Sequence, residues 1–242
     1  MTRIPSRRLA AFGLTAGLTL GLALGLAAPA WADETPPARL DQLKARADQK
    51  VKDRLTQLGT LDTSVAGAAA DCGHNADLRA QLAADKAGLT ALDATIQAET
   101  DRAKAVVEYR QIFTDYRVYW LETPKTREVV GCARVAKAAG ALTAAETKIQ
   151  ARVDEAKSNG KDVAAAQAAL DDMTAKTSAA TSAAKSADSS VIGLHADKGD
   201  RAVAGSNRTT LQAGRTNLRT ALSDLQAARS DARKAIDALK SS

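Results

Sequence analysis

The densest group of side chains with binding chemistry lies between residues 109 and 120. It contains every aromatic residue after position 32, namely Tyr109, Phe113, Tyr116, Tyr119 and Trp120. Arg110 and Arg117 stand beside them, and guanidinium groups next to rings suit a planar or anionic ligand. The alternative is packing, because a chain built mostly from Ala and Leu needs some large side chains to fill a helical core. Packing is the preferred interpretation. Tyr119, which lies off the helical stripe of the other four, is the member expected to be exposed.

Two cysteines, Cys72 and Cys132, form the second candidate pair. In an oxidising compartment a lone pair usually forms one disulfide, whereas two free thiols or an intermolecular bridge are the alternatives. If the helices run up and down, Cys132 returns to the end of the bundle where Cys72 lies. We therefore expect a Cys72–Cys132 bridge, and closing so long a loop would contribute about 4 kcal/mol on the chain-entropy model.

The sequence contains no arrangement typical of an enzyme. Its two histidines, His74 and His195, fall in expected loops and lack the spacing of metal ligands. Cys72 and Asp77 lie near His74, but a disulfide would remove the thiolate, so His74 is expected to be solvated. Gly-rich phosphate loops, Gly-x-Ser-x-Gly and His-Glu-x-x-His are absent from the sequence. We expect no catalysis, no metal and no cofactor.

The C-terminal segment is the most basic part of the chain. Residues 201–242 carry eight basic and three acidic side chains, and Arg219, Arg233 and Lys240 lie along one edge of a predicted helix. This edge suggests contact with lipid headgroups or an anionic cell-wall polymer. A solvated face with nearby aspartates as partners is the preferred alternative.

Helices are the only regular elements that the composition supports. The stop and start signals predict helices beginning after Pro37, at 75, at about 102, at Pro124, at 162 and after about 207. Residues 189–207, with three glycines, are expected to form one substantial loop. Neither Gly nor Pro marks the junction near Asp101, so 75–122 is left open as one helix or two.

The last predicted helix is the best specified. Its leucines and alanines at 211, 218, 225, 232 and 239 repeat every seven residues, as in a bundle or coiled coil. The apolar stripes are narrow and Ala-rich, so no single helix buries enough area to be stable alone. The predicted fold is an all-α, elongated antiparallel helical bundle with one disulfide.

The N-terminus has the three parts of a signal peptide. Three arginines precede an uncharged run over 9–28, which ends at Ala30-Trp31-Ala32. Cleavage is preferred over an uncleaved anchor, although the run is close to the length that spans a bilayer. The expected organisation is a signal peptide at 1–32 and one helical-bundle domain at 33–242, with no transmembrane segment after cleavage. The processed chain has a net charge of +3, too balanced for a nucleic-acid binder.

Several segments resemble uncharacterised exported helical proteins of actinobacteria. The resemblance lies in Thr114–Leu121 followed by Pro124-Lys125, in 160–172, and in the helix from Arg219 to Lys240. It covers most of the chain after the signal peptide. It implies an all-helical secreted fold and carries no function.

These features predict a non-catalytic, secreted or cell-envelope protein with an interaction or structural role. Its expected partner is another envelope protein or an anionic cell-wall polymer. The alternative is a binding module for a small or amphipathic ligand at the aromatic helix 109–120.

Overall fold

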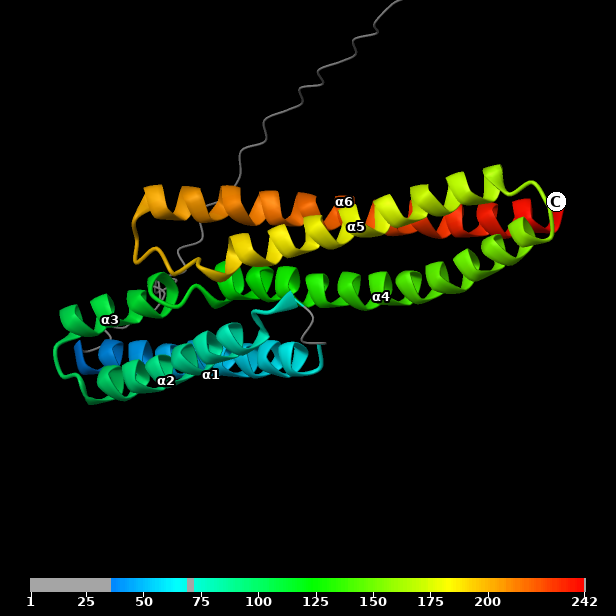
Figure 1. The fold of residues 1–242 in the computed structure, drawn as a ribbon. Coiled ribbons are helices and arrows are strands. Elements are labelled where there is room, and N and C mark those ends of the chain that lie inside the picture. The colour runs from blue at the N-terminus through cyan, green and yellow to red at the C-terminus, as the bar shows by residue number, and fades with distance from the viewer. Residues whose placement is uncertain (1–35, 69–71, 242) are drawn as a thin grey trace, which may run out of the picture. The chain divides into compact units, whose positions relative to one another are not determined.

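The computed structural model describes residues 36–68 and 72–241, and within these ranges it contains helices and no strand (Figure 1). The α-helices are α1 (Pro36–Ala66), α2 (Asn75–Ala98), α3 (Arg102–Thr114), α4 (Thr123–Ser158), α5 (Ala164–Ile192) and α6 (Arg201–Ser241), with a short π-helix, η2 (Val118–Glu122), directly before α4. The predicted all-α bundle is confirmed. The expected signal peptide, residues 1–32, lies outside the described residues. None of the described helices is both long and apolar enough to cross a bilayer.

The first three helices share one apolar core. α1 and α2 form an antiparallel hairpin, and α3 packs against both. Leu58, Leu82 and Ile112 are fully buried there, one from each helix. Lys44 and Gln97 close the free end of the hairpin, because each side chain donates a hydrogen bond to the other's backbone carbonyl, at 2.8 and 3.1 Å.

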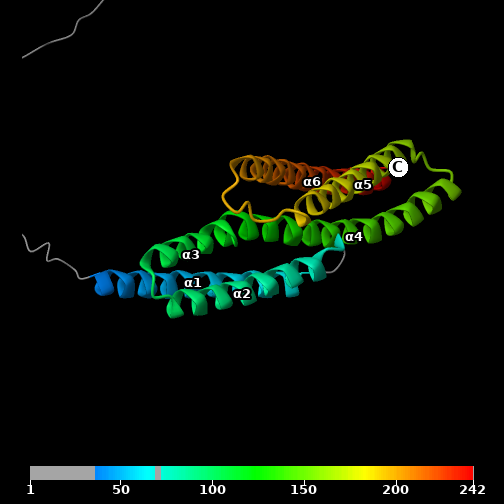
Figure 2. The same cartoon turned by 90° about the vertical axis from the view of Figure 1, so that its left-hand side faces the viewer.

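The last three helices share a second core in which alanine predominates. Figures 1 and 2 show α5 and α6 side by side along α4. The buried alanines on this interface include Ala139, Ala180, Ala184, Ala221, Ala228 and Ala235. Small side chains let the helix backbones approach closely. Gly131 of α4 is the extreme case, since a Cβ added there would lie 2.5 Å from Cδ1 of Leu218 in α6.

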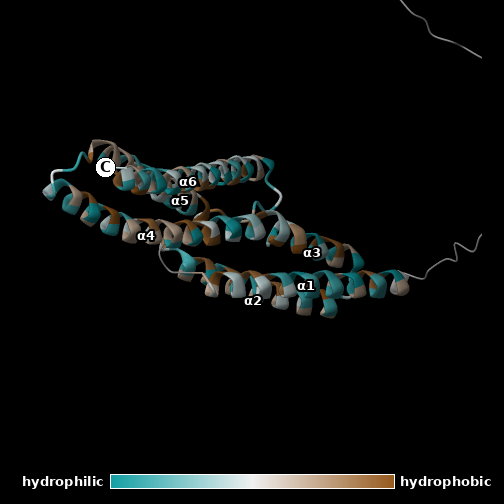
Figure 3. Cartoon of the chain, turned by 90° about the vertical axis from the view of Figure 1, so that its right-hand side faces the viewer, coloured by the Kyte–Doolittle hydropathy of each residue, from teal (hydrophilic) through white to brown (hydrophobic). Residues whose placement is uncertain are grey.

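Polar residues cover the outer sides of these helices. Figure 3 shows apolar and polar residues on different sides of single helices, as expected where only one side is buried. α6 has the clearest separation, with Leu211, Ala221, Leu225 and Ala228 buried on one side.

The segment 102–122 does not form the continuous helix that the aromatic spacing predicts. α3 ends at Thr114, Arg117 adopts a left-handed backbone conformation (φ 41°), and η2 begins at Val118. α4 then begins at Thr123 with Pro124 in its first turn, in agreement with the predicted start, but Thr123 does not cap the helix, because its hydroxyl donates to the carbonyl of Val118 at 3.0 Å. The stripe of four aromatic residues is therefore broken between Tyr116 and Trp120.

The structure corrects one predicted helix boundary, and it decides another that the sequence left open. The loop between α5 and α6 covers 193–200 rather than 189–207, because α5 continues to Ile192 and α6 starts at Arg201. Helices α2 and α3 are separate. The side chain of Asp101 caps α3 by accepting a hydrogen bond from the backbone N–H of Ala103 at 2.7 Å.

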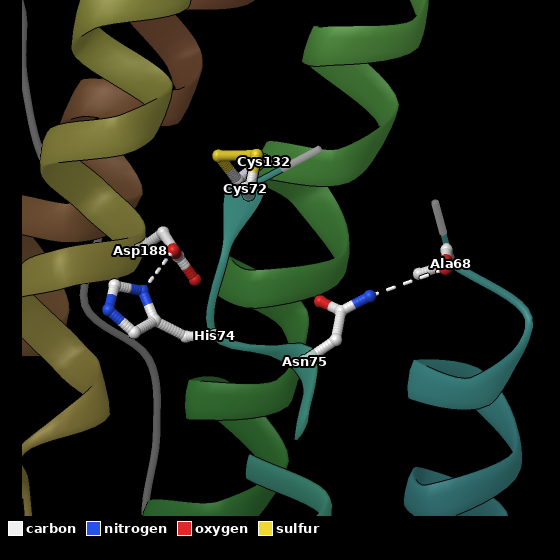
Figure 4. The surroundings of a disulfide bond; sticks show 6 residues. All are labelled: Ala68, Cys72, His74, Asn75, Cys132 and Asp188. Carbon is white, nitrogen blue, oxygen red and sulfur yellow. Dashed lines mark hydrogen bonds and ion pairs between the residues drawn. A yellow bond between two sulfur atoms is a disulfide. The ribbon is translucent and has the colours of Figure 1, made fainter. Parts of the chain in front are cut away.

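The predicted Cys72–Cys132 disulfide is present and joins the segment before α2 to α4 (Figure 4). His74, two residues further on, lies against α5, where Nδ1 is 2.5 Å from Oδ2 of Asp188. The prediction of a solvated His74 is wrong, because the ring is partly buried and paired with a fully buried carboxylate. The disulfide brings the short turn before α2 close enough to α5 for this contact.

A buried lysine makes a further connection between the two cores. Lys125 of α4 is 1% exposed. Its ammonium group donates to Oε1 of Gln81 at 2.9 Å, to Oε1 of Glu122 at 3.1 Å and to the carbonyl of Leu194 at 2.6 Å. All three of its donors are used, so this lysine holds α2, η2 and the α5–α6 loop together.

Candidate functional site

The five predicted aromatic residues divide into a packed group and an exposed pair. Tyr109 and Phe113 meet edge to face, with ring centroids 5.3 Å apart, and pack against the first core. Tyr116 is also partly buried and contacts Gly88, where an added Cβ would lie 2.6 Å from its hydroxyl. Tyr119 and Trp120 remain 50% and 43% exposed. The packing interpretation thus describes three of the rings, and the break before η2 turns the other two outward.

The two predicted arginines also separate. Arg110 is exposed on α3. Arg117 makes two parallel hydrogen bonds to Asp197 in the α5–α6 loop, from Nε to Oδ2 at 2.7 Å and from Nη2 to Oδ1 at 2.8 Å. Its guanidinium carbon also lies 5.8 Å from the centroid of Trp120. Arg117 therefore supports the exposed indole from one side, and its own charge is already paired.

Tyr119 has a support of its own. Its hydroxyl donates to the backbone carbonyl of Asp53 at 3.2 Å, and the guanidinium of Arg54 lies 5.2 Å from its ring centroid. Arg54 lies still closer to Phe113, at 4.4 Å. Tyr119 is consequently held by α1, and Trp120 by the residue directly before η2.

Trp120 and Tyr119 form one side of a groove whose other side is α6. We call it the arginine groove, and its lining residues are Tyr119, Trp120, Pro124, Arg208, Leu211, Gln212, Arg215, Thr216 and Arg219. Its volume is about 650 Å3. The lining contains three guanidinium groups and neither a carboxylate nor a histidine or cysteine. This composition suits the binding of an oxyanion and supplies no nucleophile–base pair.

The arginines reach the groove because of their spacing on α6. Arg208, Arg215 and Arg219 are separated by seven and four residues, so they share one side of the helix. Leu211 lies between them and is buried, which anchors this turn of α6. Within the described part of the chain, none of the three guanidinium groups lies within 4 Å of a carboxylate oxygen. They are available to an external anion.

A buried carboxylate lies behind these arginines. Glu128 of α4 is 3% exposed, and its Oε2 has no hydrogen-bond partner among the described residues. Burial raises the pKa of Glu128, and the positive charges of Arg215 and Arg219 oppose that shift. Glu128 lies close to Gly214, since a Cβ added to that glycine would be 3.7 Å from the Glu128 Cδ. Among the described residues, Glu128 is thus an acidic neighbour of Arg215 and Arg219, and it faces the contact between α4 and α6.

The three predicted basic contacts are spread along α6. Arg219 lies in the arginine groove, Lys240 lines a second groove near the end of the helix, and Arg233 lies between them in sequence. Lys240 is also paired with Asp237 at 3.0 Å. Sequence reasoning missed Arg208 and Arg215 as groove residues. Their seven-residue spacing placed them on the helix surface, but nothing in the sequence brought Trp120 to them.

No protein-family model matches the chain, and no curated protein or solved structure shows significant similarity to it. Among the described residues, His, Cys, Asp and Glu form no group of three or more that could hold a metal ion. The arginine groove is therefore the candidate functional site.

Proposed function

We propose that this protein is a non-catalytic interaction protein of the cell envelope or the secreted fraction, and that the arginine groove binds an anionic group of its partner. The observation that carries the proposal is the set of three unpaired guanidinium groups around the exposed ring of Trp120. Arginine binds phosphate and carboxylate groups through two parallel hydrogen bonds, and an indole adds apolar contact area beside them.

The location outside the cytoplasm is part of the same proposal. The N-terminal sequence has a basic segment, an apolar run and an Ala-x-Ala site. The Cys72–Cys132 disulfide is typical of proteins in oxidising compartments. Fractionation and N-terminal sequencing of the native protein test this part, and we expect a chain that begins at Asp33. A full-length chain recovered from the cytoplasm would contradict it.

Trp120 provides a direct test of binding, because it is the only tryptophan after position 32. A chain starting at Asp33 is suitable for this measurement, since residues 36–242 form a compact unit of their own. We expect tripolyphosphate to change the emission of Trp120 in a saturable way. Arg215→Gln should weaken this binding by about tenfold, equivalent to the loss of about one charge-assisted hydrogen bond.

Arg110→Gln is the matched control, because it removes the same charge from the exposed side of α3 outside the groove. It should leave the titration unchanged. An equal loss in both variants would indicate a general charge effect and would count against the groove. Hydrolysis of tripolyphosphate or of envelope esters that depends on an Asp or Glu residue would overturn the non-catalytic part of the proposal.

A further inference from the structure

The positive charge on α6 continues beyond the arginine groove in a single line. Residues three, four and seven apart share one side of a helix. Arg208, Arg215, Arg219, Arg229, Arg233 and Lys240 fall within such a stripe, which we call the basic stripe. At 1.5 Å per residue it is about 48 Å long. No arginine in it forms an ion pair with a described residue, whereas Lys240 is paired with Asp237, which lies on the same side of the helix.

The basic stripe runs beside the contact between α4 and α6. At one end, Pro124 of α4 faces Arg208, Arg215 and Arg219 across the arginine groove. At the other end, α4 and α6 line the second groove, with a volume of about 290 Å3. There Arg152 of α4 and Lys161 join Lys240, with Glu155 as the acidic lining residue. Each end of the stripe is thus a hollow lined by three basic side chains, and at the second end Lys240 also pairs with Asp237.

This arrangement fits a flexible chain better than a flat surface. A helix that binds at a bilayer surface presents a continuous apolar side to the lipid. The apolar side of α6 is buried against its neighbours, and along the basic stripe Leu222, at 52% exposed, is the large exposed aliphatic residue. A linear polyanion needs no apolar side, and hollows at both ends can receive successive charged units.

We propose that the basic stripe and its two end grooves bind a linear phosphate polymer laid along the α4–α6 contact. The inference rests on the proposed function of the arginine groove and extends it from one anionic group to a chain. Five of the six residues of the basic stripe are arginines. The planar guanidinium group of an arginine can donate two parallel hydrogen bonds to the oxygens of one phosphate. Several weak contacts along one polymer combine into a stronger attachment without any new contact type.

The experiment compares short and long phosphate chains on the chain starting at Asp33. We expect a linear polyphosphate of about 40 phosphates to bind about tenfold more tightly than tripolyphosphate. The double variant Arg229→Gln/Arg233→Gln lies outside the arginine groove. It should weaken polymer binding and reduce the slope of log Kd against log salt by about 1.4, while tripolyphosphate binding stays unchanged. Arg102→Gln/Arg110→Gln, with equal charge loss on α3, is the control and should preserve polymer binding.

The remaining outcomes contradict different parts of the proposal. Equal affinity for the short and the long chain would overturn the polymer inference but leave the groove function intact. Absence of binding by both would remove the groove function itself. Equal binding of poly-L-glutamate would overturn the choice of phosphate. Tighter binding to phosphatidylglycerol–phosphatidylcholine vesicles, without competition by polyphosphate, would show that the basic stripe contacts membranes and would also overturn the inference.

Discussion

The guanidinium group of Arg117 forms two parallel hydrogen bonds with the carboxylate of Asp197. This contact fixes the turn before η2, which carries the exposed rings of Tyr119 and Trp120. Arg117 is in the left-handed region just before η2, and Asp197 is buried in the loop between α5 and α6. The backbone N–H of Lys198 also donates to the carbonyl of Thr114 at 3.1 Å, so the loop is tied to the segment between α3 and η2 at two points. One side of the arginine groove is therefore held by contacts 80 residues apart in sequence.

Removal of this pair should destabilise the fold and loosen Trp120. Arg117→Ala leaves the Asp197 carboxylate buried without its main donor, and we expect a loss of about 2 kcal/mol in the free energy of unfolding. Arg117 and the N–H of Gly199 lower the pKa of Asp197. The stabilisation is therefore present above the ordinary carboxyl pKa and is lost as the pH falls through the lowered value. Urea unfolding at pH 7 and pH 3 measures both effects. Arg110→Ala should change neither.

The disulfide should stabilise the chain through the size of the loop that it closes. It spans 60 residues, which corresponds to about 4 kcal/mol in the chain-entropy model. Thermal unfolding with and without dithiothreitol should show a large drop in Tm for the wild type. Cys72→Ser/Cys132→Ser should start at the lower Tm and be insensitive to the reductant. A wild-type Tm that dithiothreitol does not change, with reduction verified by alkylation, would contradict this expectation.

Gly131 and Gly140, on the same helix, should respond differently to alanine. At Gly131 an added Cβ would lie 2.5 Å from Cδ1 of Leu218, so this side chain must move aside and Gly131→Ala should lose most of the helix-propensity gain of about 1 kcal/mol. At Gly140 no atom lies within 4 Å of such a Cβ, so Gly140→Ala should stabilise α4 by about 1 kcal/mol. Chemical denaturation of the two variants measures the contrast. Leu218→Ala in the Gly131→Ala background should recover part of the loss, and strict additivity would argue against the contact.

Asp85 should make stability fall as the pH rises from about 4 to 7. Burial and the nearby Glu122 raise the pKa of Asp85 to about 7, while Lys125 opposes the shift. The folded state therefore binds a proton that the unfolded state has already lost at about pH 4. This contribution is complete below the unfolded pKa and disappears as the pH passes the folded one.

Asp85→Asn tests this assignment. The amide cannot ionise, so the variant should be more stable than the wild type at pH 8 and should lose most of the slope between pH 5 and 7. Unfolding in urea across this range is the measurement. Asp41→Asn, on an exposed turn of α1, is the control and should keep the slope. Parallel pH profiles for wild type and Asp85→Asn would show that another group is responsible.

Much of the architecture could be predicted from local patterns. The leucine and alanine repeats predicted the helices, Pro124 predicted the start of α4, and the two cysteines predicted the disulfide, which is confirmed. The predictions are wrong where a contact between distant segments, and not the spacing of residues within one segment, determines the backbone conformation. The aromatic stripe predicted a helix through Tyr116 and Trp120, but Arg117 leaves the helical region and binds Asp197 in a distant loop.

His74 illustrates the same limit. Its position in a loop indicated solvent exposure, and only the packing of the turn before α2 against α5 showed Asp188 within hydrogen-bonding distance. Periodicity within one helix cannot identify which side chain of another helix lies opposite.

The sequence alone determined the helical class and the common edge of Arg219, Arg233 and Lys240 on the last helix, because both depend on residue types or on spacing along one segment. A lone pair of cysteines favoured the Cys72–Cys132 bridge. The tertiary structure alone decided that Trp120 faces Arg208, Arg215 and Arg219. That encounter depends on the path of the chain through the turn at Arg117 and on the packing of α6 against α4, and neither leaves a periodic signal in the residues concerned.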